Sequence, residues 1–174
     1  MKKIGSCLWK LIEKIVVGCL RLLYTALHKE LTEDVIDGFM QFVKFGLVGV
    51  SNTVVNYVIY AGALLFLQKN HLWKAYDYLI ATGIGFVLSV LWSFFWNNKF
   101  VFAVGEGENR SVLKALLKTY VSYSFTGLFL NSFLMVLWVK MLGISEFVAP
   151  IINLLVSVPL NFLINKFWAF KSER

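Results

Sequence analysis

The sequence predicts an all-α integral membrane protein: four transmembrane helices arranged as two tandem hairpin repeats, preceded by an amphipathic interfacial helix. Of its 174 residues, 59% are hydrophobic and only 16% are charged, which is far from the balance of a soluble domain. Apolar stretches of about 20 residues, the length that crosses a bilayer core, recur along the chain. These observations indicate one compact membrane domain.

The net charge of +7 follows membrane topology. Of the 17 basic residues, all but Lys69, Lys74 and Lys140 lie before or at the start of the first span, in the middle loop or at the C-terminus. Because basic residues stay on the cytoplasmic side, we expect both termini and the middle loop to be cytoplasmic, in a plasma-membrane protein. The same distribution argues against a nucleic-acid partner.

Residues 1–38 are predicted to form an arm on the cytoplasmic face, ahead of a transmembrane domain over residues 39–174. Up to Lys29, apolar residues recur at helical spacing with cationic side chains on the other face. This pattern predicts a helix lying among the headgroups of the inner leaflet. The acidic stretch 31–37 is predicted to be a short connector.

Two other interpretations of the arm follow from its apolar residues. A cleaved signal peptide is disfavoured because Glu13, Lys14 and Arg21 interrupt the apolar run. A fifth transmembrane helix around residues 15–27 is an open alternative, although it would be short and would carry Arg21. The two cysteines of the chain both lie in the arm, where a cytosolic location disfavours a disulfide.

The first two spans are predicted over residues 39–67 and 78–98. The first is charged only at Lys44, near its start, and Gly46 and Gly49 allow a neighbouring helix to approach closely. In both spans polar residues follow at intervals of four, which places them on one face of each helix. They are Asn52 and Asn56 in the first span, and Ser89, Ser93 and Asn97 in the second.

The third and fourth spans, residues 113–142 and 147–170, follow a hydrophilic loop at residues 103–111. The third span carries Asn131, and the fourth repeats amides and hydroxyls every four residues. This second polar stripe consists of Asn153, Ser157, Asn161 and Asn165. An amide in hydrocarbon costs free energy unless it finds a partner, so we expect the stripe to face other helices or a wet cavity. Pro159 should kink the fourth helix or free a carbonyl.

Each half of the domain is predicted to form a two-helix hairpin, over about residues 39–102 and 113–170. Both hairpins end on an asparagine, a lysine and an aromatic residue, beginning at Asn98 and at Asn165. By sequence the first helices align at an offset of 75 residues and the second helices at an offset of 67. Because a hairpin returns the chain to its starting side, the halves should be related by an axis along the membrane normal.

The first span and the ends of the two hairpins, here called their exits, resemble the GtrA-like family. Residues 42–56 contain an aromatic and a basic residue, a glycine-containing apolar run, then Asn-Thr and a further polar residue, similar to the opening motif of that family. Residues 98–102 and 165–170 resemble the pattern that closes its hairpins. The resemblance covers about residues 39–170. The basic residue of these motifs is lysine here, where the family often has arginine.

This resemblance implies a small four-helix protein that moves an undecaprenyl- or other polyprenyl-phosphate-linked sugar from the inner to the outer leaflet, for glycosylation of cell-surface polysaccharide or teichoic acid. Such a substrate has an anionic phosphate, a polar sugar and an apolar tail. We expect the phosphate to bind the lysines Lys44, Lys99 and Lys166. We expect the sugar to contact the polar interior, formed by Asn52, Asn56, Ser89, Ser93, Asn97, Asn98, Asn131, Asn153, Ser157, Asn161 and Asn165.

Both groups also have a purely structural interpretation, since lysines at helix ends commonly anchor topology and buried amides commonly join helices. The sequence contains no recognisable Cys/His cluster, catalytic triad, Asp-x-Asp motif or nucleotide-sugar domain. We therefore expect no metal, no cofactor and no enzymatic activity. No acidic residue lies deep in a span, which disfavours proton-coupled antiport.

Two functions follow from these features. The first is facilitated, energy-independent flipping of a lipid-linked sugar. The second is a membrane adaptor or anchor that recruits a polyprenyl-phosphate glycosyltransferase. Either protein would work among membrane lipids, and the sequence leaves open the sugar, the acceptor polymer and whether two copies act as a homodimer.

Overall fold

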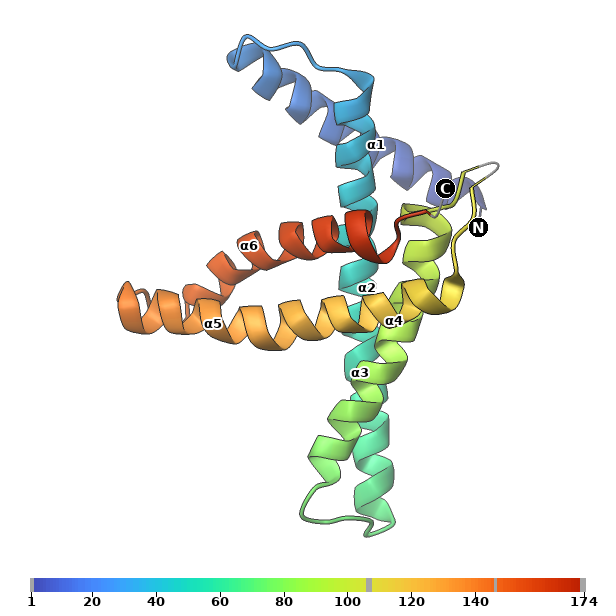
Figure 1. The fold of residues 1–174 in the computed structure, drawn as a ribbon, viewed down its shortest axis with the longest axis vertical. Coiled ribbons are helices and arrows are strands. Elements are labelled where there is room, and N and C mark those ends of the chain that lie inside the picture. Colours follow the sequence, from blue (N-terminus) through green and yellow to red (C-terminus); the bar gives the residue numbers. More distant parts are fainter. Residues whose placement is uncertain (1, 106–107, 146, 173–174) are drawn as a thin grey trace. The chain divides into compact units, whose positions relative to one another are not determined.

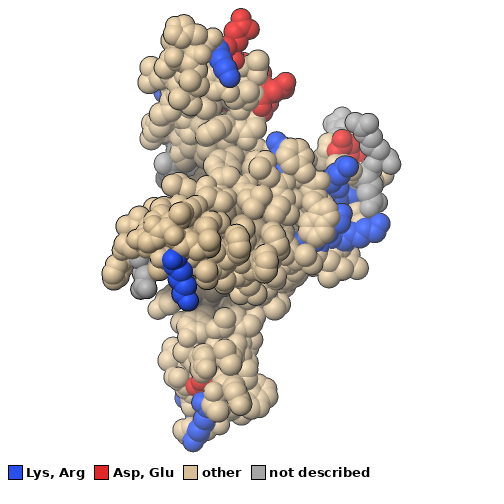
Figure 2. Space-filling model, turned by 60° about the vertical axis from the view of Figure 1, so that its left-hand side comes forward, with Lys and Arg blue, Asp and Glu red and all other residues tan. Residues whose placement is uncertain are grey.

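The computed structural model describes residues 2–105, 108–145 and 147–172, and these fold into helices joined by short connections (Figure 1). Within the described residues, four helices are long and apolar enough to cross a membrane: Glu33–Lys69, Asp77–Val101, Val112–Met141 and Ile151–Ala169. This confirms the predicted all-α architecture with four spans, and the chain is a multi-pass membrane protein. The face drawn in Figure 2 is largely uncharged, as contact with lipid requires.

The chain folds as two compact units that divide between Lys44 and Phe45. In the first unit, α1 (Lys2–Ala26) forms the predicted helix at the N-terminal arm. The ammonium group of Lys44 lies 5.3 Å from the centre of the Trp9 ring, a cation–π contact. Among the described residues, α1 is not one of the helices apolar enough to span a membrane, so nothing in the structure supports a fifth span.

The first span, α2 (Glu33–Lys69), begins earlier than predicted. The acidic stretch predicted as a connector forms its first turns, where Glu33 and Asp34 interact favourably with the free N–H groups and the dipole of the helix. His71 follows the helix in the left-handed conformation, with φ 53°, and His28 follows α1 with φ 51°. Both histidines therefore terminate helices, a position that favours residues tolerant of this conformation.

The remaining helices complete two hairpins in the second unit. The first hairpin pairs α2 with α3 (Asp77–Trp96), which continues as η1 (Asn97–Val101). The second pairs the third span with α6 (Ala149–Ile164) and η4 (Asn165–Ala169). The third span consists of α4 (Val112–Ser124), η2 (Phe125–Leu130), α5 (Asn131–Val136) and η3 (Leu137–Met141). The η segments are π-helices, in which each N–H bonds to the carbonyl five residues earlier.

Both prolines of the chain lie in α6. Pro150 occupies the first turn, where its missing N–H has no helical partner to lose. Pro159 lies inside the helix, which continues to Ile164. Because proline has no N–H, the carbonyl of Leu155 lacks its usual donor, as expected from the sequence.

Each hairpin ends in a five-residue π-helix that starts with asparagine. In η1 and η4, the N–H of the following phenylalanine, Phe102 or Phe170, donates to the carbonyl of the first asparagine, Asn97 or Asn165, at 2.8 Å. The matching residues are 68 positions apart, so the offset of 67 derived from the sequence is wrong by one. In the sequence alignment Asn98 was matched with Asn165, whereas in the structure the backbone hydrogen bonds match Asn97 with Asn165. The offset of 68 brings the two polar stripes into register.

Matched positions of the two repeats hold the two helices of each hairpin together. In the first, Asn56 Nδ2 donates to Ser89 Oγ at 3.1 Å. A Cβ atom on Gly85 would lie 3.2 Å from the carbonyl oxygen of Asn56, so glycine allows the close approach there. In the second, Asn153 Nδ2 donates to the backbone and side-chain oxygens of Asn131. Gly85 and Asn153 occupy matched positions of the two repeats. Gly85 allows close helix packing in the first hairpin, and Asn153 forms hydrogen bonds between the helices of the second.

Five buried phenylalanines join the two hairpins beside their exits. Phe102 and Phe170 stack at 4.7 Å between ring centres, and the remaining rings continue this contact at 5.5 to 6.1 Å. The cluster consists of Phe45, Phe94, Phe102, Phe162 and Phe170. Since both exits and α2 contribute, this apolar core fixes the hairpins to each other at one end of the bundle.

Arg110, in the middle loop, connects the same two exits by hydrogen bonds. Its Nη1 donates to the Phe170 carbonyl at 2.7 Å, and its Nη2 donates to the Phe102 carbonyl at 2.7 Å and to Asn98 Oδ1 at 2.6 Å. Burial lowers the pKa of Arg110, and nearby Glu108 opposes this shift. The planar guanidinium holds its N–H donors in a fixed fork, so its two terminal nitrogens reach three separate acceptors at once.

Replacing Arg110 should therefore loosen the exits. We expect Arg110→Ala to lower the unfolding free energy by about 2 kcal/mol, because three acceptors lose a charged donor. Arg110→Lys should recover little of this loss. Thermal unfolding in detergent measures the effect, with Lys171→Ala, at an exposed cation of the C-terminus, as the matched control. Equal melting temperatures for Arg110→Ala and Lys171→Ala would contradict this account of the exits.

Candidate functional site

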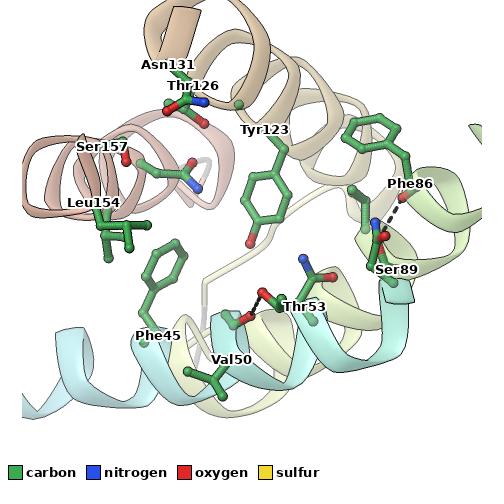
Figure 3. A pocket seen from close by; sticks show the side chains of 18 residues that line it. Phe45, Val50, Thr53, Phe86, Ser89, Tyr123, Thr126, Asn131, Leu154 and Ser157 are labelled. Carbon is green, nitrogen blue, oxygen red and sulfur yellow. Dashed lines mark hydrogen bonds between the residues drawn. The ribbon is translucent and has the colours of Figure 1, made fainter. Parts of the chain in front are cut away.

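A cavity of about 780 Å³ lies among the spans of the second unit. Its walls come from the middle parts of α2, α3, the third span and α6. Figure 3 shows Tyr123, from the third span, and Phe45, from α2, projecting into this space. Several lining residues, including Val50 and Leu154, are also exposed on the surface of the second unit, so the cavity is open and not sealed by its helices.

The cavity is built from corresponding positions of the two repeats. On the second helices, which match at an offset of 68, the paired lining residues are Phe86 with Leu154, Ser89 with Ser157, and Val90 with Val158. On the first helices, at an offset of 75, they are Asn52 with Gly127, and Asn56 with Asn131. The cavity therefore lies between the two hairpins and is lined by matched positions of both.

Two polar groups of the lining are free to bind a ligand. The side-chain oxygen of Asn52 is buried and has no hydrogen-bond partner among the described residues. The hydroxyl of Ser157, on α6, likewise makes no hydrogen bond within the described part of the chain. A buried acceptor without a partner costs free energy. A ligand hydroxyl that donates to Asn52 would remove this cost.

Other lining groups are held in place by neighbouring helices. Tyr123 shares a 2.7 Å hydrogen bond with Ser93 and accepts a bond of 3.3 Å from Asn97 Nδ2. Asn161 Oδ1 accepts from Ser122 Oγ at 3.0 Å and from Asn165 Nδ2 at 2.9 Å. These contacts orient the cavity side chains before any ligand binds, which reduces the entropy lost on binding.

The structure divides the polar residues predicted as sugar contacts into two groups. Six line the cavity: Asn52, Asn56, Ser89, Asn131, Ser157 and Asn161. Five lie outside its described lining: Ser93, Asn97, Asn98, Asn153 and Asn165. Those five hydrogen-bond to other helices or to the middle loop. Of them, Asn97 and Asn165 are fully buried, and each donates to the side chain four positions earlier and to a hydroxyl of α4, which is Tyr123 for Asn97 and Ser122 for Asn165.

Each of the three lysines predicted to bind phosphate lies over aromatic rings. Lys44 lies over Trp9, Lys99 over Phe95 and Phe100, and Lys166 over Phe162 and Phe167, at 5.3 to 5.9 Å from the ring centres. Phe162 also meets the ring of Phe45, a cavity residue, at 5.5 Å. Two ring contacts thus connect Lys166 with the cavity wall. Lys118, which donates to the Trp168 carbonyl at 3.2 Å, is a further cation at the same exit.

Sequence reasoning missed the aromatic part of the site. Phe45, Phe86 and Tyr123 line the cavity, and none was predicted to do so. A signal was present for Tyr123, because it lies three residues before Thr126 and so shares a helix face with it. The signal was weaker for the phenylalanines, since most of the many aromatic residues in this chain face lipid or pack in the core.

Stability measurements should separate the two groups of polar residues. Asn153→Ala leaves Trp138 Nε1, which donates to Asn153 at 2.9 Å, without its acceptor, so we expect a loss of about 1 to 3 kcal/mol. Ser157→Ala breaks no hydrogen bond within the described residues and should change the unfolding free energy by less than about 0.5 kcal/mol. Thermal unfolding of the purified variants in detergent measures both. A larger loss for Ser157→Ala than for Asn153→Ala would contradict this division.

Comparison with known proteins places these residues in a family context. The family described as "GtrA/DPMS, transmembrane domain" matches residues 44–170 of the chain. This range contains all four helices of the cavity from Lys44 onward. No solved structure matches the chain.

The chain is also similar to curated bacterial proteins. It is 26% identical over 128 residues to the cell wall teichoic acid glycosylation protein GtcA of Listeria innocua, covering 71% of this chain and 88% of that protein. It is 24% identical to the protein of the same name from Listeria monocytogenes serovar 1/2a, with the same coverage. The similarity therefore extends over nearly the whole of both relatives.

Proposed function

The chain belongs to the GtrA/DPMS transmembrane domain family, and we propose that it serves the glycosylation of a cell-wall polymer by moving a polyprenyl-phosphate-linked sugar from the inner to the outer leaflet. The observation that carries the proposal is the cavity shared by both repeats, which presents amides and hydroxyls in the middle of four apolar helices. The name of the GtcA relatives supports the polymer class.

The polar cavity supports sugar binding on physical grounds. A sugar that crosses the hydrocarbon core must exchange its water for other hydrogen-bond partners. Asn52 and Ser157 offer free groups from opposite repeats, and Asn131 adds a further amide at the surface of the same cavity. The tail needs no such partners, and because the cavity is open, the tail can stay in lipid while the sugar occupies the cavity.

The lysines of the exits support phosphate binding beside the cavity. Lys166 is in ring contact with the cavity wall through Phe162, and Lys118 lies on the neighbouring α4. Lys99 and Lys44 extend the cationic set to the other exit and to the start of the first span. In the proposed topology all of them lie on the cytoplasmic side, where the loaded lipid carrier is expected to enter.

The energy source follows from the absence of acidic residues. No described lining residue of the cavity carries a carboxylate, which disfavours the exchange of a proton for the substrate there. We propose that the sugar moves down its own gradient, maintained by synthesis on one side and consumption on the other.

Reconstitution of the full chain in liposomes tests the proposal. We expect it to accelerate transbilayer movement of a polyprenyl-phosphate hexose. Asn52→Ala should slow this movement about tenfold, because one hydrogen bond to the sugar is lost. Lys166→Gln should raise the substrate concentration at which the rate of movement is half-maximal, because a cation that binds the phosphate is lost. Asn70→Ala, at the exposed end of α2, and Lys171→Gln serve as matched controls. Movement is followed by the access of a membrane-impermeant reagent to the sugar.

The contrary outcome would favour the second function, a membrane anchor for a glycosyltransferase. The family description joins GtrA and DPMS transmembrane domains, and the resemblance includes domains attached to such enzymes. An anchor would not accelerate movement in liposomes. It would instead copurify with the enzyme from native membranes and lose this association when residues 1–38 are removed.

A further inference from the structure

The described lining of the cavity carries no charged side chain. Every described residue that lines the cavity is apolar or a neutral polar residue. Lys166, which two ring contacts connect with the cavity wall, lies over Phe162 and Phe167 at the exit of the second hairpin. A substrate that fills the cavity therefore meets no side chain able to neutralise an ionised group.

The walls of the cavity suit a sugar ring without charge. Phe45, Phe86 and Tyr123 offer apolar ring surfaces, and Val90 and Val158 add aliphatic ones. A pyranose has apolar C–H faces and hydroxyls at its edge, so rings and neutral amides together match its surface. The free oxygen of Asn52 requires a donor, which any sugar hydroxyl supplies.

An ionised sugar would be disfavoured at this place. A carboxylate or an ammonium group in the middle of four apolar helices loses its hydration, and only a counter-ion compensates for that loss. Neutral amides and hydroxyls replace part of the hydration of a hydroxyl group, but they do not neutralise a full charge.

We propose that the cavity is a charge filter, selecting carriers whose glycosyl group is neutral, such as a hexose or an N-acetylhexosamine, and rejecting uronic acids and unacetylated amino sugars. The inference rests on the proposed function and adds the chemical class of the sugar to it. The single negative charge tolerated by the protein is that of the phosphate, which binds outside the cavity.

A panel of lipid probes tests the filter with the full chain in liposomes. The probes are polyprenyl-phosphate glucose, galactose, N-acetylglucosamine, glucuronate and glucosamine, used at a pH where the carboxylate is ionised and the amine is protonated. We expect at least one of the three neutral probes to move at least about tenfold faster than both charged probes, because a tenfold preference requires only a small difference in binding free energy.

An isosteric variant tests the mechanism. Asn52→Asp places a carboxylate at the buried unpartnered oxygen. It should slow the neutral probes and accelerate the glucosamine probe relative to the unmodified protein. Asn70→Asp makes the same substitution at the exposed end of α2 and should leave the selectivity unchanged. Circular dichroism and gel filtration confirm that both variants fold.

The outcomes distinguish the filter from the function on which it rests. If the unmodified protein moves charged and neutral probes at similar rates, the filter is wrong while translocation stands. If it moves none of the five probes, translocation fails and the filter fails with it. If Asn52→Asp folds and keeps the selectivity of the unmodified protein, the cavity at Asn52 does not set the choice of sugar.

Discussion

The structure depends on one constraint: an amide or hydroxyl placed among apolar helices needs a hydrogen-bond partner. Asn56 meets it across the first hairpin with Ser89, and Asn153 meets it across the second with Asn131. Where the partner is missing, as at the side-chain oxygen of Asn52, the same constraint creates a binding group. The same kind of side chain therefore holds the helices together where it is paired and, in the proposed function, is available to the sugar where it is not.

Much of the architecture could be predicted from the sequence because it rests on local patterns. Apolar length determines the four spans, and the four-residue spacing of Ser157 and Asn161 places both on the cavity face of α6. The start of α2 was misjudged because Glu33 and Asp34 look like a loop by charge alone, although carboxylates are favourable at a helix N-terminus. The repeat offset was wrong because adjacent asparagines make the letters ambiguous, and only the backbone hydrogen bonds resolve them.

Which residues line the cavity was harder to predict, because the lining depends on long-range packing. Every polar residue of the stripes lies on an inward-facing surface, but sequence spacing does not tell which of them meets a neighbouring helix first. Asn97 is fully buried against Ser93 and Tyr123, whereas Ser157 remains free. From the sequence, Arg110 was only one cation of a hydrophilic loop. Its role depends on the carbonyls of Phe102 and Phe170, which are far apart in the sequence and come together only in the fold.

The two repeats have diverged around a shared framework. Both keep the π-helical exit and its buried asparagine, and both supply a serine to the cavity. Their first helices differ, since Asn52 of α2 corresponds to Gly127 of the third span. The two halves thus share the π-helical exit and differ at this pair of cavity positions.

Cysteine accessibility measures whether the cavity holds water and binds the lipid-linked sugar, as the proposed function requires. In a chain whose two native cysteines are replaced by alanine, Ser157→Cys should react with a hydrophilic thiol reagent in liposomes, and a polyprenyl-phosphate hexose should slow the reaction. Leu155→Cys, on the lipid-exposed face of the same helix, should stay unlabelled. Equal labelling at both positions, or labelling at Ser157→Cys that the lipid-linked sugar leaves unchanged, would contradict the account.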